Sequence, residues 1–174
     1  MINNTQDREV IEQENSIVKR YDLTNYLIEQ YNFVDYLEIG VAFGNCVRNV
    51  KVKNKDAVDP VVEANVRCPE INYEMTSNEF FALEKIQNKK YDVIFIDGLH
   101  ETTQVDIDIQ NSLKHLNEGG FILLHDCNPV SYESQLVPRQ ATAWNGDVWK
   151  SIVKLRCSDV DLDINVVDTD YGVG

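Results

Sequence analysis

The sequence predicts an α/β fold in which a mostly parallel, twisted sheet has helices on both faces. Short apolar runs rich in β-forming residues recur along the chain, as expected of buried parallel strands. Segments with helical spacing separate these runs, which is typical of strand-helix-strand units with right-handed crossovers. Two glycines, Gly40 and Gly44, directly follow the first run and indicate a tight turn that leads into a helix.

Each element follows from its local pattern. We expect strands at 33–39, 55–59, 71–75, 91–96, 121–124 and 162–167. We expect helices at 7–31 with a break at 22–24, after Gly44, at 77–88, at 102–116 and at 151–155. A turn is expected at 117–120. The last strand leads into a turn whose second strand is missing from the pattern, so the final hairpin is expected to be incomplete and to leave an open edge that favours a homo-oligomer.

Composition excludes several classes of partner. The chain has 174 residues and a formal net charge of −13, so its field repels phosphate backbones and anionic lipid surfaces. No apolar run approaches the ~20 residues needed to span a bilayer, and residues 1–15 do not resemble a signal peptide. The 4 cysteines form no C-x-x-C pair. We therefore expect a cytoplasmic protein that binds neither nucleic acid nor membrane.

The glycine turn indicates a nucleotide-like cofactor. Glu38 ends the first apolar run, and Gly40 and Gly44 leave room for a ligand close to the backbone. Ala42 stands where a dinucleotide fingerprint has its middle glycine, which argues against NAD and FAD. A carboxylate at Glu38 suits a ligand with an ammonium group and no phosphate, and the methionine part of S-adenosylmethionine fits that description.

Two further residues are candidates for contacts with such a cofactor. Asp59 ends the second expected strand about 20 residues after Gly40, where a ribose-binding carboxylate is expected. The simpler alternative is an Asp that begins a turn before Pro60. Ser77 is read first as a helix cap, and in a nucleoside-binding sheet the same loop lies near the base.

Chemistry-bearing side chains follow the two most apolar strands. Asp97 follows 91–96, and His125 and Asp126 follow 121–124. Ligands and reactions of open α/β sheets lie at the carboxyl ends of the strands. His100 and His125 are candidate general bases, because an imidazole titrates near neutral pH. The alternatives, a helix-start residue for His100 and a buried satisfied ring for His125, are equally open.

Three further residues near these strand ends have a structural explanation or two competing ones. Asp106 and Asp108 are expected on the exposed face of helix 102–116. Trp144 either stacks on a sugar or aromatic ring of a substrate or anchors its loop to the core.

These motifs together resemble the class I S-adenosylmethionine-dependent methyltransferases. The residues that carry the resemblance lie between Tyr36 and Pro129: Glu38-Ile39-Gly40 with Gly44, Val58-Asp59-Pro60, Phe95-Ile96-Asp97-Gly98-Leu99-His100, Gly119-Gly120 and His125-Asp126. Within that superfamily the chain is most similar to the small-molecule branch with Ile-Asp-Gly-x-His and His-Asp motifs. The resemblance implies a Rossmann-like three-layer sandwich.

The resemblance also implies roles for individual residues. It places Glu38, Gly40, Gly44, Asp59, Ser77 and Asp97 around S-adenosylmethionine. In related metal-dependent enzymes the positions that match Asp97, His125 and Asp126 hold a divalent cation. His125 replaces a carboxylate, and a histidine ligand shifts the preference from Mg²⁺ toward Mn²⁺, Fe²⁺ or Zn²⁺. Asp97, His100, His125 and Asp126 are thus the candidate catalytic residues.

We expect a single domain with three parts. Residues 1–32 form an N-terminal helical cap, 33–129 the cofactor-binding core, and 130–174 an acceptor-side loop, helix and final strand. The expected function is O-methylation of a small-molecule hydroxyl, on a sugar or natural-product-like acceptor, with Mg²⁺ or another divalent metal as a candidate second cofactor. The alternatives are a non-catalytic S-adenosylmethionine-binding domain and a Rossmann-like oxidoreductase.

Overall fold

The computed structural model describes residues 12–61, 68–158 and 161–174. The described residues form two compact units. The first, which we call the sheet unit, consists of the described residues of 21–99 and 107–123. The second, the loop unit, consists of the described residues 12–20, 100–106 and 124–174.

A sheet with strand order β2-β1-β3-β4 organises the sheet unit. The strands are β1 (Asp35–Ile39), β2 (Asn54–Val58), β3 (Tyr91–Ile96) and β4 (Leu116–Leu124). β1 is parallel to both β2 and β3, and Leu37 lies opposite Asp56 on one side and Ile94 on the other. The predicted α/β class with a parallel sheet is therefore confirmed.

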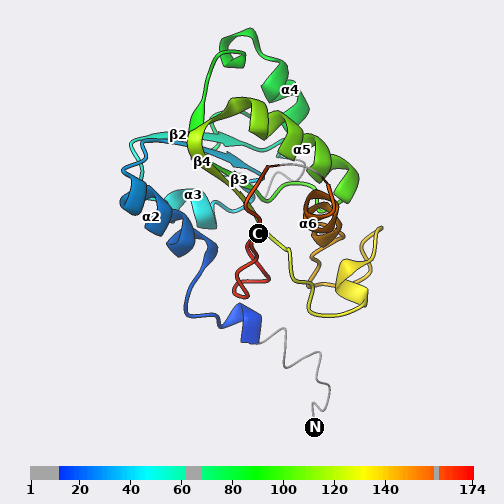
Figure 1. The fold of residues 1–174 in the computed structure, drawn as a ribbon. Helices are drawn as coiled ribbons and strands as arrows, with labels where there is room; N and C mark the ends of the chain where they lie inside the picture. The colour runs from blue at the N-terminus through cyan, green and yellow to red at the C-terminus, as the bar shows by residue number, and fades with distance from the viewer. Residues whose placement is uncertain (1–11, 62–67, 159–160) are drawn as a thin grey trace. The chain divides into compact units, whose positions relative to one another are not determined.

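Helices lie on both sides of this sheet (Figure 1). These helices are α2 (Arg20–Tyr31), α3 (Asn45–Asn49), α4 (Ser77–Ala82) and α5 (Thr102–His115). A further helix, α6 (Trp149–Arg156), belongs to the loop unit. Figure 1 shows α2 and α3 on one side of the sheet and α4 and α5 on the other. No helix of the described residues is long and apolar enough to cross a membrane.

The core on one face of the sheet explains why α2 and α3 pack there. Ile28 of α2 and Cys46 of α3 pack on Tyr36, Val93 and Phe95, which are buried. Since side chains alternate along a strand, Leu37 and Ile94 point to the opposite face.

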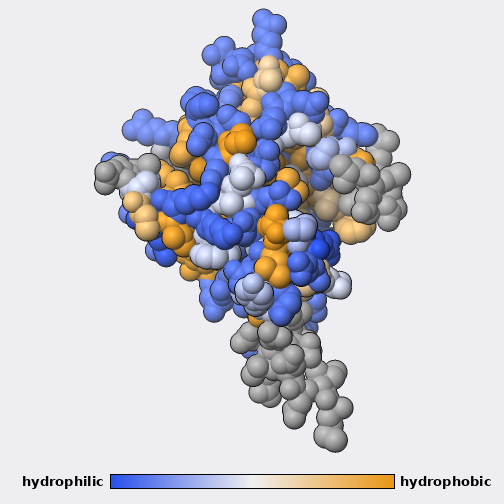
Figure 2. Space-filling model, turned by 90° about the vertical axis from the view of Figure 1, so that its right-hand side faces the viewer, coloured by the Kyte–Doolittle hydropathy of each residue, from blue (hydrophilic) through white to orange (hydrophobic). Residues whose placement is uncertain are grey.

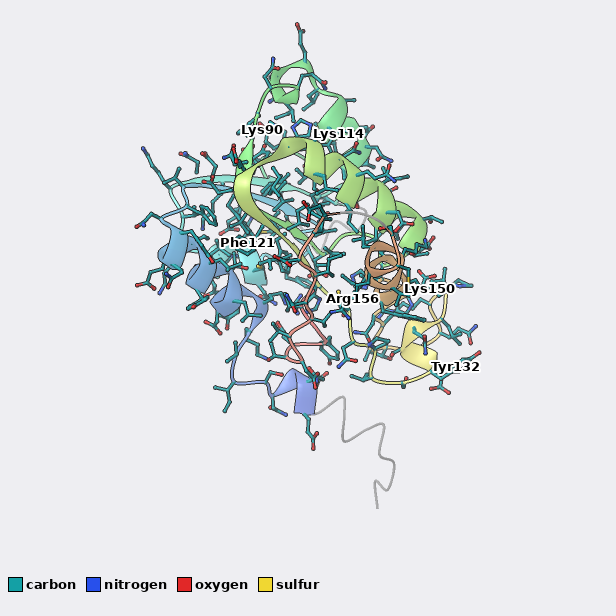
Figure 3. The ribbon with its side chains drawn as sticks, viewed as in Figure 1. Lys90, Lys114, Phe121, Tyr132, Lys150 and Arg156 are labelled. Carbon is teal, nitrogen blue, oxygen red and sulfur yellow. The ribbon has the colours of Figure 1, made fainter. Side chains whose placement is uncertain are left out.

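An aromatic group extends this packing to β4. The ring centroid of Tyr31 lies 5.3 Å from that of Phe33 and 5.2 Å from that of Phe121. Figure 3 shows Phe121 on the side of the sheet where α2 lies. The three rings therefore join the end of α2 to the segment before β1 and to β4.

Two expected strands are reduced to isolated bridges. Residues 71–75 form one parallel bridge, between Val58 and Tyr73. The ladder does not extend because the Ala57 N–H donates to the side chain of Asn72 at 2.7 Å and not to a backbone carbonyl. Residues 162–167 contribute one antiparallel bridge, between Val167 and Val173, and Gly174 exchanges two backbone hydrogen bonds with Leu124. The returning arm of this hairpin is therefore short.

Several boundaries also differ from those expected. Within the described part of 7–31, the break precedes Arg20, where α2 begins, and does not fall at 22–24; residues 7–11 lie outside the described residues. The expected turn at 117–120 is part of β4. The helix expected at 77–88 ends at Ala82 and is followed by a short 3₁₀ helix, Glu84–Ile86.

Candidate cofactor and acceptor sites

The glycine turn after β1 lies at the point where the strand order reverses. β1 lies between β2 and β3, so the connection from β2 to β3 passes β1. Open α/β sheets bind ligands at such a switch point, beyond the carboxyl ends of the strands. The ends of β1 and β3 border this switch point, and Gly40 and Asp97 are the residues that follow them.

The backbone of this turn requires glycine. Gly40, Ala42 and Gly44 have φ values of 83°, 46° and 79°, which lie in the left-handed region. A β-carbon at Gly40 would lie 2.1 Å from the carbonyl oxygen of Asp97. A β-carbon at Gly44 would lie 2.3 Å from Cys68 Sγ. The two glycines therefore let the turn pack directly against the end of β3 and against Cys68, where a side chain would clash.

Asp59 holds the turn in this shape. Its Oδ2 accepts hydrogen bonds from the N–H groups of Val41 at 2.9 Å and Ala42 at 3.0 Å. Its Oδ1 accepts one from Val61 N–H at 2.7 Å. Three of the roughly four lone-pair positions of the carboxylate are thus occupied. Asp59 shapes the glycine turn directly, and a contact with the ribose stays a prediction.

Glu38 lies beneath the turn. Its side chain is 1 % exposed; Oε2 accepts from the Tyr36 hydroxyl at 2.6 Å, and Oε1 accepts from Val47 N–H at 3.3 Å. Burial raises the pKa of this carboxyl to about 7, and the charge of Asp97 acts in the same direction, against the lowering effect of the Tyr36 hydrogen bond. Glu38 thus links β1 to the start of α3, and its contact with the methionine end stays a prediction.

Ser77 and Asp97 have other partners in the sheet unit. Ser77 Oγ donates to Asp108 Oδ1 at 2.6 Å. Asp108 is buried, so the expectation that it lies on an exposed helix face is wrong. The cap of α4 is Thr76 and not Ser77. The backbone N–H of Asp97 donates to the carbonyl of Ile39 at 2.8 Å, which fixes the end of β3 beside Gly40.

Asp126 is the centre of a polar cluster in the loop unit. It is buried and has a left-handed φ of 61°. Its Oδ1 accepts from Asn145 Nδ2 at 2.6 Å. Its Oδ2 lies 3.3 Å from His100 Nε2 and 3.0 Å from His125 Nδ1. The structure therefore brings three of the predicted catalytic residues together: Asp126, His100 and His125.

His100 is the more accessible imidazole of this cluster, since its side chain is 22 % exposed whereas that of His125 is 3 % exposed. Its Nδ1 lies 3.0 Å from the carbonyl oxygen of Trp144. A carbonyl only accepts hydrogen bonds, so Nδ1 carries the hydrogen, and Nε2 is the ring nitrogen that faces Asp126 Oδ2. The Trp144 ring stacks on His100 with centroids 5.3 Å apart. Trp144 therefore fixes the ring plane of His100, which sequence reasoning did not foresee.

His125 lies behind Asp126 and is buried. Its Nε2 lies 2.6 Å from the carbonyl oxygen of Asp170, and its Nδ1 lies 3.2 Å from Arg20 Nη1. Arg20 Nε also donates to Asp170 Oδ2 at 2.8 Å. Burial alone would raise the pKa of Asp170, but the hydrogen bond and positive charge of Arg20 lower it overall. Both ring nitrogens of His125 thus face protein groups, which suits support of Asp126 better than direct ligation.

Sequence reasoning missed Arg20, Asn145 and Asp170. Asp170 lies 45 residues after His125 in the chain, and Arg20 lies 105 residues before it. Neither carries a local signal that connects it to the site. Asn145 stands before Gly146 in a pattern that indicates only a turn.

The donor set of the loop unit fits a divalent cation. Asp126 Oδ2 and His100 Nε2 lie 3.3 Å apart, and His100 is partly exposed. A carboxylate oxygen and an imidazole nitrogen are ligands that Mn²⁺, Fe²⁺ and Zn²⁺ accept. The sheet unit fits a nucleoside cofactor by its glycine turn. The fold and these residues thus define a class of protein, the cofactor-binding α/β domains.

The family is shown by the sequence. Residues 37–127, more than half of the chain, match the family described as methyltransferase domain, and the chain belongs to this family. The resemblance to class I S-adenosylmethionine-dependent methyltransferases is confirmed.

One curated protein is similar to part of this chain. The chain is 26 % identical over 124 residues to an uncharacterized protein, R132, of Acanthamoeba polyphaga mimivirus. The match covers 59 % of this chain and 56 % of that protein, so the chain spans about half the length of the curated relative.

Solved structures share the fold. An O-methyltransferase of Bacillus cereus in complex with SAH matches with a TM-score of 0.57 at 14 % identity, over 99 % of this chain and 89 % of that one. The SAH-bound methyltransferase PaMTH1 of Podospora anserina matches with a TM-score of 0.61 at 14 % identity, over 99 % and 86 %. The MycE methyltransferase of the mycinamycin pathway, in complex with Mg and SAH, matches with a TM-score of 0.56 at 14 % identity, over 98 % and 53 %.

Proposed function

We propose that this methyltransferase transfers a methyl group from S-adenosylmethionine to a hydroxyl group of a small molecule, such as a sugar or a natural-product-like acceptor. The observation that carries the proposal is the His100–Asp126 pair, which follows two strands of a methyltransferase sheet with its Nε2 and Oδ2 3.3 Å apart. One solved neighbour of the same fold is an O-methyltransferase in complex with SAH, which supports the cofactor and the oxygen acceptor.

The cofactor is assigned to the sheet unit. Gly40 and Gly44 allow the turn its left-handed backbone, and Asp59 holds the turn through hydrogen bonds from the N–H groups of Val41 and Ala42. Asp59, Ser77 and Asp97 are the proposed polar contacts, and Glu38 acts from below the turn.

The residues of the loop unit handle the acceptor proton. S-adenosylmethionine supplies a methyl group on a positively charged sulfur, which leaves as a neutral thioether. His100 accepts the proton of the acceptor hydroxyl at Nε2, and the Asp126 carboxylate stabilises the imidazolium that forms. The Trp144 carbonyl holds the ring in the tautomer that this step needs.

A divalent cation is proposed to lower the pKa of the acceptor hydroxyl. Its ligands would be Asp126 Oδ2 and His100 Nε2 of the loop unit. Because Nε2 has a single lone pair, the role of His100 as a base applies to the protein without the cation. His125, an expected ligand, is assigned instead to the support of Asp126. The Mg in the MycE neighbour supports a cation in this fold.

The test is a pair of calorimetric titrations of the metal-stripped protein, one with S-adenosylhomocysteine and one with Mn²⁺. Asp59→Ala should weaken S-adenosylhomocysteine binding at least tenfold, or about 1.4 kcal/mol, and leave Mn²⁺ binding unchanged. Asp126→Ala should do the reverse. Asp168→Ala, an exposed carboxylate of the loop unit, is the matched control and should change neither.

Each failure has a separate meaning. A folded wild-type protein that does not bind S-adenosylhomocysteine would contradict the cofactor assignment. Binding that survives in Asp59→Ala would contradict only the role of the turn. Methyl transfer that persists in His100→Ala, measured as S-adenosylhomocysteine released with a panel of catechols and sugars, would contradict the base assignment.

A further inference from the structure

The amide of Asn145 is the inner partner of Asp126. Asn145 is 1 % exposed, and its Nδ2 donates to Asp126 Oδ1 at 2.6 Å. The N–H groups of Asn145 and Gly146 both donate to the carbonyl of Ser134, at 2.9 and 3.0 Å. The backbone therefore holds the amide in place, independently of its contact with Asp126.

The orientation of this amide follows from its partner. A carboxylate only accepts hydrogen bonds, so the NH₂ group and not the carbonyl must face Asp126. The buried Oδ1 of Asn145 then has no hydrogen-bond partner among the described residues. A buried acceptor without a donor costs about 1–3 kcal/mol. Such a group in a folded protein requires an explanation, and a ligand that brings the donor is one.

The same contact divides the two oxygens of Asp126. Oδ1 is occupied by Asn145, which leaves Oδ2 directed at His100 and His125. The left-handed backbone of Asp126, φ 61°, is uncommon for a residue other than glycine and needs the surroundings to hold it. Asn145 and the two imidazoles supply that restraint from opposite sides of the carboxylate.

We propose that Asn145 is a positioning residue that fixes Asp126 so that Oδ2 is presented to a divalent cation. The proposal rests on the proposed function, because it deepens the cation site of the same cluster. Mg²⁺ and Mn²⁺ keep several water ligands, and a water on the cation supplies the donor that Asn145 Oδ1 lacks. Outer-shell partners of this kind affect metal affinity by about 10–100-fold when they are replaced.

The experiment measures Mn²⁺ affinity by calorimetry in the metal-stripped full chain. Asn145→Leu keeps the volume and removes both polar groups, and it should weaken Mn²⁺ binding by about 10–100-fold. Its affinity for S-adenosylhomocysteine should stay within about twofold of wild type, because the glycine turn belongs to the sheet unit. Asn128→Ala, an Asn of the loop unit bonded to Asp168, is the matched control and should bind Mn²⁺ as wild type does.

Three results would overturn the proposal: wild-type Mn²⁺ affinity in Asn145→Leu, an equal loss in Asn128→Ala, or no Mn²⁺ binding by a folded wild-type protein. A residue with a merely structural role would lower the melting temperature and leave the Mn²⁺ dissociation constant unchanged. If Asn145→Leu does not fold, Asn145→Ser takes its place with the same expected direction. Loss of S-adenosylhomocysteine binding by the wild type would instead count against the proposed function.

Discussion

A buried carboxyl group at Glu38 couples the sheet unit to pH. Burial raises the pKa of Glu38 from 4.5 to about 7, so the folded state holds a proton that the unfolded state releases. For a raised pKa, the stabilisation is complete below the unfolded value and is lost as the pH rises through the folded value. The window therefore runs from about pH 4.5 to pH 7.

This shift predicts a stability that falls with pH. A pKa difference of about 2.5 between the folded and unfolded states corresponds to about 3 kcal/mol of free energy of unfolding. We expect Glu38→Gln to flatten the dependence of melting temperature on pH between pH 5 and 8. Glu118→Gln, an exposed residue of β4, should keep the wild-type slope. Parallel slopes for wild type and Glu38→Gln in calorimetric melts would show that Glu38 does not carry this proton.

At the residue scale, the sequence predicted the parts of the site that follow strands. Gly40, Asp97 and Asp126 could be placed because each follows a strand of the expected parallel sheet. Asn145 could not be placed, because its role depends on a side-chain contact across 19 positions of an irregular segment. No periodic pattern or local propensity specifies such a contact.

At the scale of elements, the start of α4 is fixed by a capping box. Thr76 accepts from the N–H of Glu79, and the Glu79 carboxylate accepts from the N–H of Thr76. These hydrogen bonds lower the pKa of Glu79, so their stabilisation is present above its ordinary pKa and is lost as the pH falls.

We expect Thr76→Ala to lower the free energy of unfolding by about 1 kcal/mol, which is typical of a lost N-cap. Thr76→Ser keeps the hydroxyl and should restore most of this loss. The measurement is urea unfolding at pH 7. An effect of the same size in Thr76→Ser would mean that the methyl group and not the cap is responsible.

Elements with one dominant signal were predicted well, and elements that depend on distant partners were not. The continuous apolar run of β3 fixed both of its ends at Tyr91 and Ile96. The run 71–75 looks like a strand, yet the Asn72 side chain takes the place of a backbone acceptor in the ladder. The turn pattern at 117–120 is overridden by sheet pairing, and β4 continues through it.

At the scale of the whole molecule, the net charge of −13 is the dominant property. On the face shown in Figure 2, hydrophilic residues predominate and hydrophobic ones occur in small groups. A homo-oligomer, expected from the open edge of the sheet, stays a prediction. The same charge favours neutral or cationic acceptors over polyanions.

Self-repulsion at this net charge should make the stability depend on salt. The screening length falls from about 30 Å at 0.01 M to about 10 Å at 0.1 M ionic strength, and the repulsion within the compact state weakens accordingly. We expect NaCl to raise the melting temperature at pH 8 by roughly 2–4 °C, or about 1 kcal/mol for a chain of this length. Near the sequence pI of 4.5 the net charge vanishes, and the effect should vanish with it. A melting temperature that falls with NaCl at pH 8 would show that ion pairs such as Lys154–Asp106, at 2.6 Å, outweigh the repulsion.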